Sequence, residues 1–391
     1  MAPEMEKTSG PGRNVAVIRK ERDMSQVKLA RRAGVSVSLL SKIEVGDRAL
    51  TQGVAAALAR AMGTTLDEVL GKTEIKQDSE ANLQELRAAI RRFDLPGESL
   101  TERDILTHEL RELVKFRGDA NLSKVLKRLP GLLSRATNYA HAVGTPDAWA
   151  MVSDIYSAVY WLAARHRWMG LAELAVIKQR LAAERATPLA GAIAARDEAG
   201  TFLNCGDFEG GLAVVDRAIV QAEESMEGRD KSLGLGLLHL RGLTLAGRLR
   251  EKAEAERHMA AAWHVSEEFP KDVDVCGIQF GPENTATHVI ATQVDLENHG
   301  QALNVARDLS HRTLTLPATR TGPLYMNVAR AKLALRDRDG ALDSLVDAWD
   351  AAPQMAKVHP TSQELLRVLS SLHKRSNPKL TKLLKQARVR I

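Results

Sequence analysis

Residues 24–50 read MSQVKLARRAGVSVSLLSKIEVGDRAL and contain two short helical patterns separated by a single glycine. Ser25 and Ser36 precede these patterns, and a serine in that position accepts a hydrogen bond from an unpaired backbone N–H of the first helical turn. Gly34 supplies the left-handed residue that ends the first helix and lets the chain turn sharply. The stretch therefore predicts two helices joined by a tight turn, the first running from Ser25 through Arg32.

The second of these helices leaves polar side chains on its open face. Leu40 and Ile43 occupy its inward positions. Short hydroxyl and lysine side chains can hydrogen-bond base edges, and a valine can meet a thymine methyl group. Two helices of which the first shields the second form the helix-turn-helix, which places its second helix in the major groove of DNA. The residues of the predicted reading face are Ser36, Val37, Ser38, Ser41 and Lys42.

At the residue level this stretch resembles the xenobiotic-response-element (XRE, or Cro/cI-like) family of helix-turn-helix regulators. The resemblance covers about residues 12–71, because VAAALARAMGTTLDEVL matches the fourth and fifth helices of that family. It implies a five-helix, lambda-repressor-like domain that binds DNA. The residues that carry the resemblance are Arg19, Arg22, Ser25, Gln26, Leu29, Ala30, Gly34, Val35, Ser36, Ser41, Ile43, Glu44, Gly46 and Arg48.

The resemblance also implies individual roles. Gln26 would touch a phosphate at the start of its helix, and Arg48 would contact the DNA backbone. Arg19 and Glu44 would form an internal structural pair, since a charge in that position is costly without its partner. The segment ALT after Arg48 departs from the Pro-Ser or Pro-Thr that the family often has, and leaves Thr51 as the N-cap of the fourth helix.

Composition favours an all-α protein. Apolar residues make up 44% of the 391 residues and aromatic residues only 4%, and no strand pattern interrupts the helical ones. Cys205 and Cys276 lie far apart without a CxxC spacing, which argues against a disulfide framework, a zinc site or a redox motif. We expect no metal, no cofactor and no membrane span, and a cytoplasmic, nucleoid-associated protein.

The patterns divide the chain into a disordered N-terminus (1–11), the helix-turn-helix domain (12–71), a linker (72–80) and a long helical domain (81–391). In the long domain, helix pairs are predicted to turn around Gly206, Gly247, Gly300 and Gly340. These pairs resemble degenerate tetratricopeptide (TPR) repeats, which stack into a superhelix with a concave groove. A compact, irregular helical domain is the alternative. The combination resembles regulators of an actinobacterial type.

Three features of the long domain suggest ligand contacts. Aromatic side chains recur on one helical face, the loop at residues 277–288 interrupts the repeats, and asparagines lie on or beside the repeat helices. In peptide-pheromone regulators of similar architecture, asparagine side chains often bind the peptide backbone. The aromatic rings could instead fill a seam between helices, and the asparagines could be caps or surface residues. The candidate ligand-binding residues are Trp149, Tyr156, Tyr160, Asn204, Phe280, Asn284, His288 and Asn327.

Enzyme motifs are absent from the sequence. SLGLGLLHL lacks the third glycine of a dinucleotide loop, His108-Glu109 lacks the second histidine of a zinc protease, and no Gly-x-Ser-x-Gly or Walker lysine occurs. The sequence therefore predicts a non-enzymatic transcriptional regulator, such as a repressor, that binds an inverted-repeat operator as a homodimer and responds to a peptide or small-molecule effector. A DNA-tethered scaffold for a partner protein and a constitutive nucleoid-type binder are the alternatives.

Overall fold

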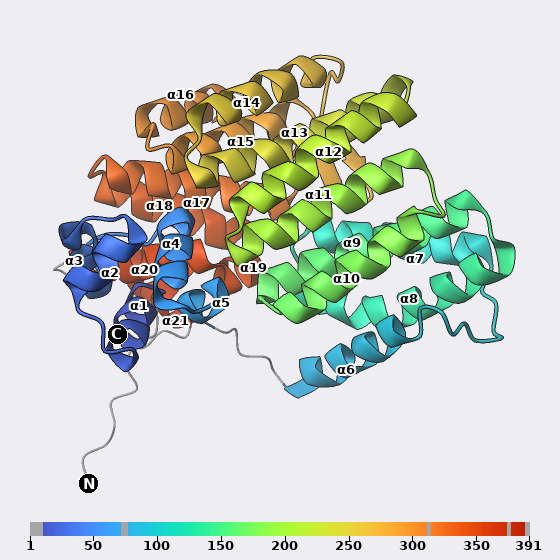
Figure 1. Ribbon diagram of the computed structural model, residues 1–391, viewed down its shortest axis with the longest axis horizontal. Coiled ribbons are helices and arrows are strands. Elements are labelled where there is room, and N and C mark those ends of the chain that lie inside the picture. Colours follow the sequence, from blue (N-terminus) through green and yellow to red (C-terminus); the bar gives the residue numbers. More distant parts are fainter. Residues whose placement is uncertain (1–10, 72–76, 311–313, 374–376, 388–391) are drawn as a thin grey trace, which may run out of the picture. The chain divides into compact units, whose positions relative to one another are not determined.

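The computed structural model describes residues 11–71, 77–310, 314–373 and 377–387 (Figure 1). Within these ranges the chain forms 21 helices and one hairpin of two short strands, which confirms the predicted all-α class and adds the hairpin to it. The predicted disordered terminus lies outside the described residues except for residue 11, and so does the linker from 72 to 76. The remaining linker residues, 77–80, belong to a helix.

The chain separates into two compact units. Unit 1 combines Met1–Thr73 with Gly322–Ile391, and unit 2 is Glu74–Thr321. The division differs from the predicted one, in which all residues from 81 to 391 formed a single domain. The last 70 residues group instead with the helix-turn-helix domain. Glu364 and Arg367 contact that domain through hydrogen bonds to the Leu50 N–H and the Ile43 carbonyl.

The N-terminal part of unit 1 is a bundle of five helices: α1 (Pro11–Glu21), α2 (Gln26–Ala33), α3 (Val37–Val45), α4 (Gln52–Met62) and α5 (Leu66–Leu70). The expected caps form. Ser25, Ser36 and Thr51 accept hydrogen bonds from backbone N–H groups at the starts of α2, α3 and α4. Gly34 ends α2 in the left-handed conformation (φ 66°), which glycine adopts without steric cost.

The C-terminal part of unit 1 consists of α17 (Ala318–Ala334), which begins just before the unit boundary, α18 (Arg338–Ala351), α19 (Pro353–Val358), α20 (Pro360–Leu372) and α21 (Pro378–Ala387). Prolines stand at the first turns of α19 and α20, where no backbone donor is needed. The core of this part centres on Trp349, whose indole N–H donates to the Ser362 hydroxyl at 2.9 Å.

Unit 2 is an array of antiparallel helices. In Figure 1 the helices from α9 to α14 follow one another, and each packs on the next. Its elements are α6 (Gln77–Arg91), α7 (Arg103–Gly118), α8 (Leu122–Val143), α9 (Pro146–His166), α10 (Met169–Ala183), α11 (Pro188–Cys205), α12 (Phe208–Ser225), α13 (Gly228–Leu249), α14 (Lys252–Ser266), β1 (Val273–Val275), β2 (Ile278–Phe280), α15 (Pro282–Asp295) and α16 (His299–Ser310).

Only one of the four predicted turn glycines is at a turn. Gly206 ends α11 with φ 82°, but the other three lie inside α13, α16 and α18. The chain turns instead at Arg250, Glu297 and Arg336, which adopt positive φ values of 67°, 65° and 68°. Gly247 serves packing, because a Cβ there would meet the Thr292 side chain at 2.9 Å. The prediction was therefore wrong for Gly247, Gly300 and Gly340, which lie within helices.

The β1–β2 hairpin overlaps the predicted interrupting loop, residues 277–288, only at residues 277–280, and residues 282–288 of that loop belong instead to α15. Its two-residue turn consists of Cys276 and Gly277, and both have positive φ (53° and 82°). Two positive φ values at the centre of a turn are typical of the type I′ hairpin connection. Strands of three residues are too short to give an alternating pattern, which explains why the sequence analysis missed them.

Candidate functional site

The reading face of α3 is exposed because the opposite face anchors the helix. Leu40 is fully buried and Ile43 is 1% exposed, whereas Val37 is 40% exposed. Ser38 and Lys42 are also exposed, and Ser41 is half-buried. Ser36 accepts the Leu39 N–H at 3.1 Å, which leaves its own hydroxyl hydrogen available to a phosphate oxygen. The helix thus presents hydroxyl, methyl and ammonium groups together, the set that major-groove base edges can meet.

Charge around α3 favours a polyanion. Residues 11–71 contain ten basic and six acidic side chains, a net charge of +4. The basic side chains at Lys28, Arg31, Arg32, Lys42 and Arg48 are all exposed. Because each phosphate contact by a lysine or arginine releases condensed counterions, such a surface contributes affinity for DNA regardless of sequence.

Arg19 and Glu44 form the internal pair that the family resemblance implied. Arg19 Nε donates to Glu44 Oε1 at 2.7 Å and its terminal nitrogen donates to Oε2 at 2.8 Å. A third donor of Arg19 reaches the Met24 carbonyl at 2.7 Å. Burial alone would raise the pKa of Glu44, but the hydrogen bonds from Arg19 and Gln26 outweigh it and lower the pKa. The pair therefore ties α1 to the end of α3 as a charged unit.

Gln26, the predicted phosphate contact, is held by the carboxylate of this pair. Its side-chain nitrogen donates to Glu44 Oε2 at 2.8 Å, and the residue is half-buried. An amide nitrogen carries two hydrogens, so the second remains for a phosphate oxygen. Arg48 is exposed at the turn after α3, and its backbone N–H donates to the Lys42 carbonyl at 3.1 Å.

A contact between α20 and α3 was not foreseen from the sequence. Arg367 donates from a terminal nitrogen to the Ile43 carbonyl at 3.0 Å, near the C-terminus of α3. Glu364, only 2% exposed, accepts the Leu50 N–H at 2.9 Å and also pairs with Arg367 at 2.6 Å. Arginine at a helix C-terminus satisfies a free carbonyl and complements the helix dipole. We refer to Glu364 and Arg367 as the C-terminal clamp.

Gly46 makes the clamp possible. It ends α3 with φ 97°, a conformation that favours glycine, and a Cβ there would lie 2.5 Å from a terminal nitrogen of Arg367. No sequence pattern links residues 46 and 367. The one sequence signal for the clamp was an acidic residue three positions before an arginine in the otherwise apolar stretch ELLRVLSSL, residues 364–372.

The eight candidate ligand-binding residues do not form a single site. Trp149 and Tyr156 of α9 are buried, and their rings lie 5.9 Å from that of Phe93, which follows the end of α6. Phe280 packs edge-on against Phe269 at 5.2 Å. Trp149, Tyr156 and Phe280 are therefore core residues, because their rings pack against other buried side chains.

The asparagines are also separated from one another. Asn284 is fully buried and donates to the Gln279 carbonyl at 2.7 Å, which fixes the hairpin to α15. Asn327 lies on α17 within unit 1, where it donates to the Pro323 carbonyl at 3.0 Å. Asn204 donates to the Tyr160 hydroxyl at 3.4 Å, so these two residues do meet. His288 places Nδ1 3.1 Å from the Thr244 hydroxyl, and its Nε2 has no hydrogen-bond partner among the described residues.

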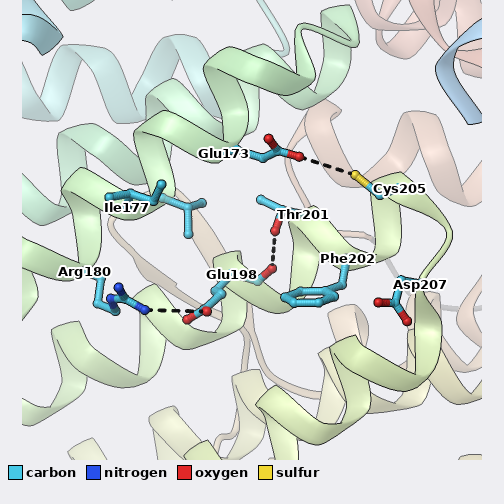
Figure 2. Close-up of a pocket in the computed structure, with 9 residues that line it drawn as sticks. Glu173, Ile177, Arg180, Glu198, Thr201, Phe202, Cys205 and Asp207 are labelled. Carbon is cyan, nitrogen blue, oxygen red and sulfur yellow. Dashed lines mark hydrogen bonds and ion pairs between the residues drawn. The ribbon is translucent and has the colours of Figure 1, made fainter. Parts of the chain in front are cut away.

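A pocket of about 390 Å³ opens between α10, α11 and α12, and none of the eight candidates lines it (Figure 2). Two polar pairs cross it: Arg180 with Glu198 at 3.8 Å, and the Cys205 thiol with Glu173 at 3.7 Å. Phe202 and Ile177 supply apolar walls. The sequence analysis missed this pocket because its walls are ordinary helix-surface residues.

No group of three or more metal-binding side chains is found in the ranges that the structure describes. Over the same ranges, no helix is long and apolar enough to cross a membrane.

Comparison with known proteins supports the assignment of the N-terminal domain. Residues 15–69 match the model of the family described as Helix-turn-helix. This segment covers α1 to α5 almost completely, so the N-terminal part of the chain is a helix-turn-helix domain of the DNA-binding, XRE type.

Similar solved structures include three of PrgX. The crystal structure of the PrgX/iCF10 complex is 10% identical, with 97% of this chain and 98% of that chain covered and a TM-score of 0.26. The PrgX/cCF10 complex is 11% identical, with 94% and 95% covered and a TM-score of 0.25, and PrgX alone is 11% identical, with 96% and 98% covered and a TM-score of 0.24. At these scores the similarity carries no argument about ligand or function. Comparison with curated proteins gave no match.

Proposed function

We propose that the protein is a sequence-specific transcriptional regulator that binds an inverted-repeat operator as a homodimer. The observation that carries the proposal is the exposed face of α3, where Val37, Ser38 and Lys42 stand opposite the buried Leu40 and Ile43. A single domain of this size offers little DNA contact area, and two copies would read half-sites about one helical turn, roughly 34 Å, apart. We place the protein in the cytoplasm, on the nucleoid, and without catalytic activity.

The helical array of unit 2 is the proposed sensor. A peptide or small-molecule effector bound there would alter DNA binding. If the protein is a repressor, the effector would release it from the operator. A ligand shifts such an equilibrium only by binding two arrangements of the protein unequally. Buried nitrogens of Arg117, Arg165 and His288 in unit 2, which have no hydrogen-bond partner among the described residues, support the presence of a ligand site.

The proposal is tested by selecting bound sites from random DNA with the full-length protein. We expect enrichment of an inverted repeat whose half-sites are separated by one helical turn. Enrichment of a single half-site would contradict the dimer, and binding without sequence preference would contradict the regulator and support a nucleoid-type binder.

Lys42→Ala is expected to weaken binding to the selected site by about 1–3 kcal/mol, because its ammonium group lies on the reading face. If Lys42 reads a base, the variant also loses preference at one base pair. The measurement is an affinity titration at several salt concentrations with the preferred site and single-base variants. Uniform weakening with a shallower salt slope would instead assign Lys42 to a phosphate.

Lys127→Ala is the matched control. Lys127 is an exposed lysine on α8 in unit 2, and its removal changes the net charge by the same amount. Equal losses of affinity in both variants would show that only overall charge matters and would remove Lys42 from the reading face.

A further inference from the structure

Five arginines from five helices converge inside unit 2. The guanidinium carbons of Arg117 and Arg165 each lie 5.7 Å from the centre of the Trp161 ring. Arg241 Nε donates to the Arg196 carbonyl at 3.0 Å. The fifth arginine, on α17, is close enough to the other four for their charges to lower its pKa in addition to the larger effect of burial. The arginine cluster consists of Arg117, Arg165, Arg196, Arg241 and Arg320.

These arginines have few acidic partners. Arg196 pairs with Asp197 at 2.5 Å, and within the described ranges no carboxylate lies within ion-pair distance of the other four. The second oxygen of Asp197 is taken up by the Ser157 hydroxyl at 2.6 Å and by the Gln179 side chain at 3.2 Å. Of the other neighbouring carboxylates, Asp154 accepts the Cys276 thiol and Asp274 accepts the Gly277 N–H. Asp272, which lies close enough to Arg320 to feel its charge, accepts the Glu283 and Asn284 N–H groups. Five guanidinium groups therefore face four carboxylates, which leaves an excess of one positive charge and several N–H donors without an acidic partner.

The cluster is largely removed from solvent, so this excess is costly. Arg117 is 3% exposed and Arg196 is 9% exposed, and Arg165, Arg241 and Arg320 are half-buried. The Nε atoms of Arg117 and Arg165 are buried and have no hydrogen-bond partner in the described part of the chain. Burial lowers the pKa of Arg165 and of Arg196 to about 10, which still leaves both charged at neutral pH. Buried charges are normally paired, and within the described ranges only Arg196 of the cluster has a carboxylate at ion-pair distance.

Three of the sequence-predicted ligand residues adjoin the cluster. A Cβ at Gly200 would collide with the Tyr160 hydroxyl and would lie 3.1 Å from a terminal nitrogen of Arg241, so both groups border the same point. Asn204 binds that hydroxyl. Burial, and then the charges of Arg320, Arg196 and Arg241, lower the pKa of His288, so its imidazole is neutral at physiological pH. Its unpartnered Nε2 is a further polar group for a ligand.

We propose that the arginine cluster binds a small molecule through a dianionic oxygen group, which is either a phosphate or a pair of carboxylates. Its negative charge would offset the excess on the cluster, and its several oxygens would accept from guanidinium N–H groups such as the Nε–H of Arg117 and of Arg165, which have no partner among the described residues. Guanidinium groups suit this ligand because their planar N–H pairs bind phosphate and carboxylate oxygens in parallel. The anion site stands on the geometry of unit 2, and only the identification of its ligand as the effector rests on the proposed function.

The test is calorimetric titration of the full-length protein without DNA, using inorganic phosphate, succinate and acetate as probes. We expect one of the two dianions to bind one site per chain with a dissociation constant of about 1 mM or tighter, and acetate to bind at least about tenfold more weakly. The dianion that binds distinguishes phosphate from dicarboxylate chemistry. Binding of neither dianion, or equal binding of acetate, would overturn the proposal. Because no DNA is present, a failure of DNA binding does not affect this result.

Arg320→Met is expected to lower the affinity for the dianion that binds wild type at least about tenfold while the protein stays folded. Among the described residues no carboxylate lies within ion-pair distance of Arg320, and four other arginines repel it, so its neutral replacement should largely keep the melting temperature. The control is Arg180→Met, which removes an exposed arginine of the pocket in Figure 2 that already pairs with Glu198. Loss of binding in Arg180→Met with none in Arg320→Met would place the anion in that pocket and refute the cluster. Unchanged binding in both variants would also refute it.

Discussion

Replacement of Arg19 by alanine is expected to reduce the free energy of unfolding of the helix-turn-helix domain by about 3–5 kcal/mol. The variant leaves the Glu44 carboxylate, whose side chain is 6% exposed, without its bidentate partner. It also removes the donor to the Met24 carbonyl. Hydrogen exchange of the backbone amides of α1 and α3 in the full-length protein measures the effect within this domain.

Lys20→Ala is the control, since Lys20 is the adjacent basic residue and is exposed. The pH dependence gives a second check. The folded state lowers the pKa of Glu44 below its ordinary value of 4.5, so its contribution is complete above that value and is lost as pH falls through the lower, folded pKa. The difference between wild type and Arg19→Ala should therefore shrink in acid. A difference that is small at neutral pH, or that grows in acid, would contradict the assigned role.

Glu364→Ala is the second large change, with an expected loss of about 3–5 kcal/mol in the stability of unit 1. It removes a buried carboxylate and leaves the buried Leu50 N–H without an acceptor and Arg367 without its acidic partner. Because Arg367 donates a hydrogen bond to the Ile43 carbonyl, we expect the end of α3 to loosen and DNA affinity to fall together with stability.

Glu364→Gln is the matched variant, because an amide oxygen can still accept the Leu50 N–H while the charge is lost. We expect it to lie between wild type and alanine in both properties. The measurements are hydrogen exchange at the end of α3 and operator affinity. If Glu364→Ala altered exchange only in α18 to α21, the clamp would not support α3.

The features that sequence predicted are local in origin. The caps Ser25, Ser36 and Thr51, the left-handed Gly34 and the inward Leu40 and Ile43 depend on neighbours within four residues, and all are confirmed. For the same reason the fold class was predictable, since helical periodicity repeats along the whole chain. The DNA contacts assigned to α3 and to Gln26 and Arg48 stay predictions.

The features that sequence did not predict depend on distant contacts. The left-handed turns at Arg250, Glu297 and Arg336 use residues with no special turn preference, so only the packing of the following helices determines them. Arg117 and Arg320 are 203 positions apart in sequence, and nothing in either local pattern indicates that they meet. The clamp joins residues 43 and 367 for the same kind of reason.

The composition of unit 1 from both ends of the chain has a consequence for synthesis. A ribosome produces the N-terminal helices first, and domains generally fold in that order. The carbonyl of Ile43 and the N–H of Leu50 nevertheless acquire their partners only after Glu364 and Arg367 have been translated. A nascent or prematurely terminated chain would therefore carry a complete helix-turn-helix sequence without its finished support, so full DNA-binding competence would be reserved for chains translated through α20.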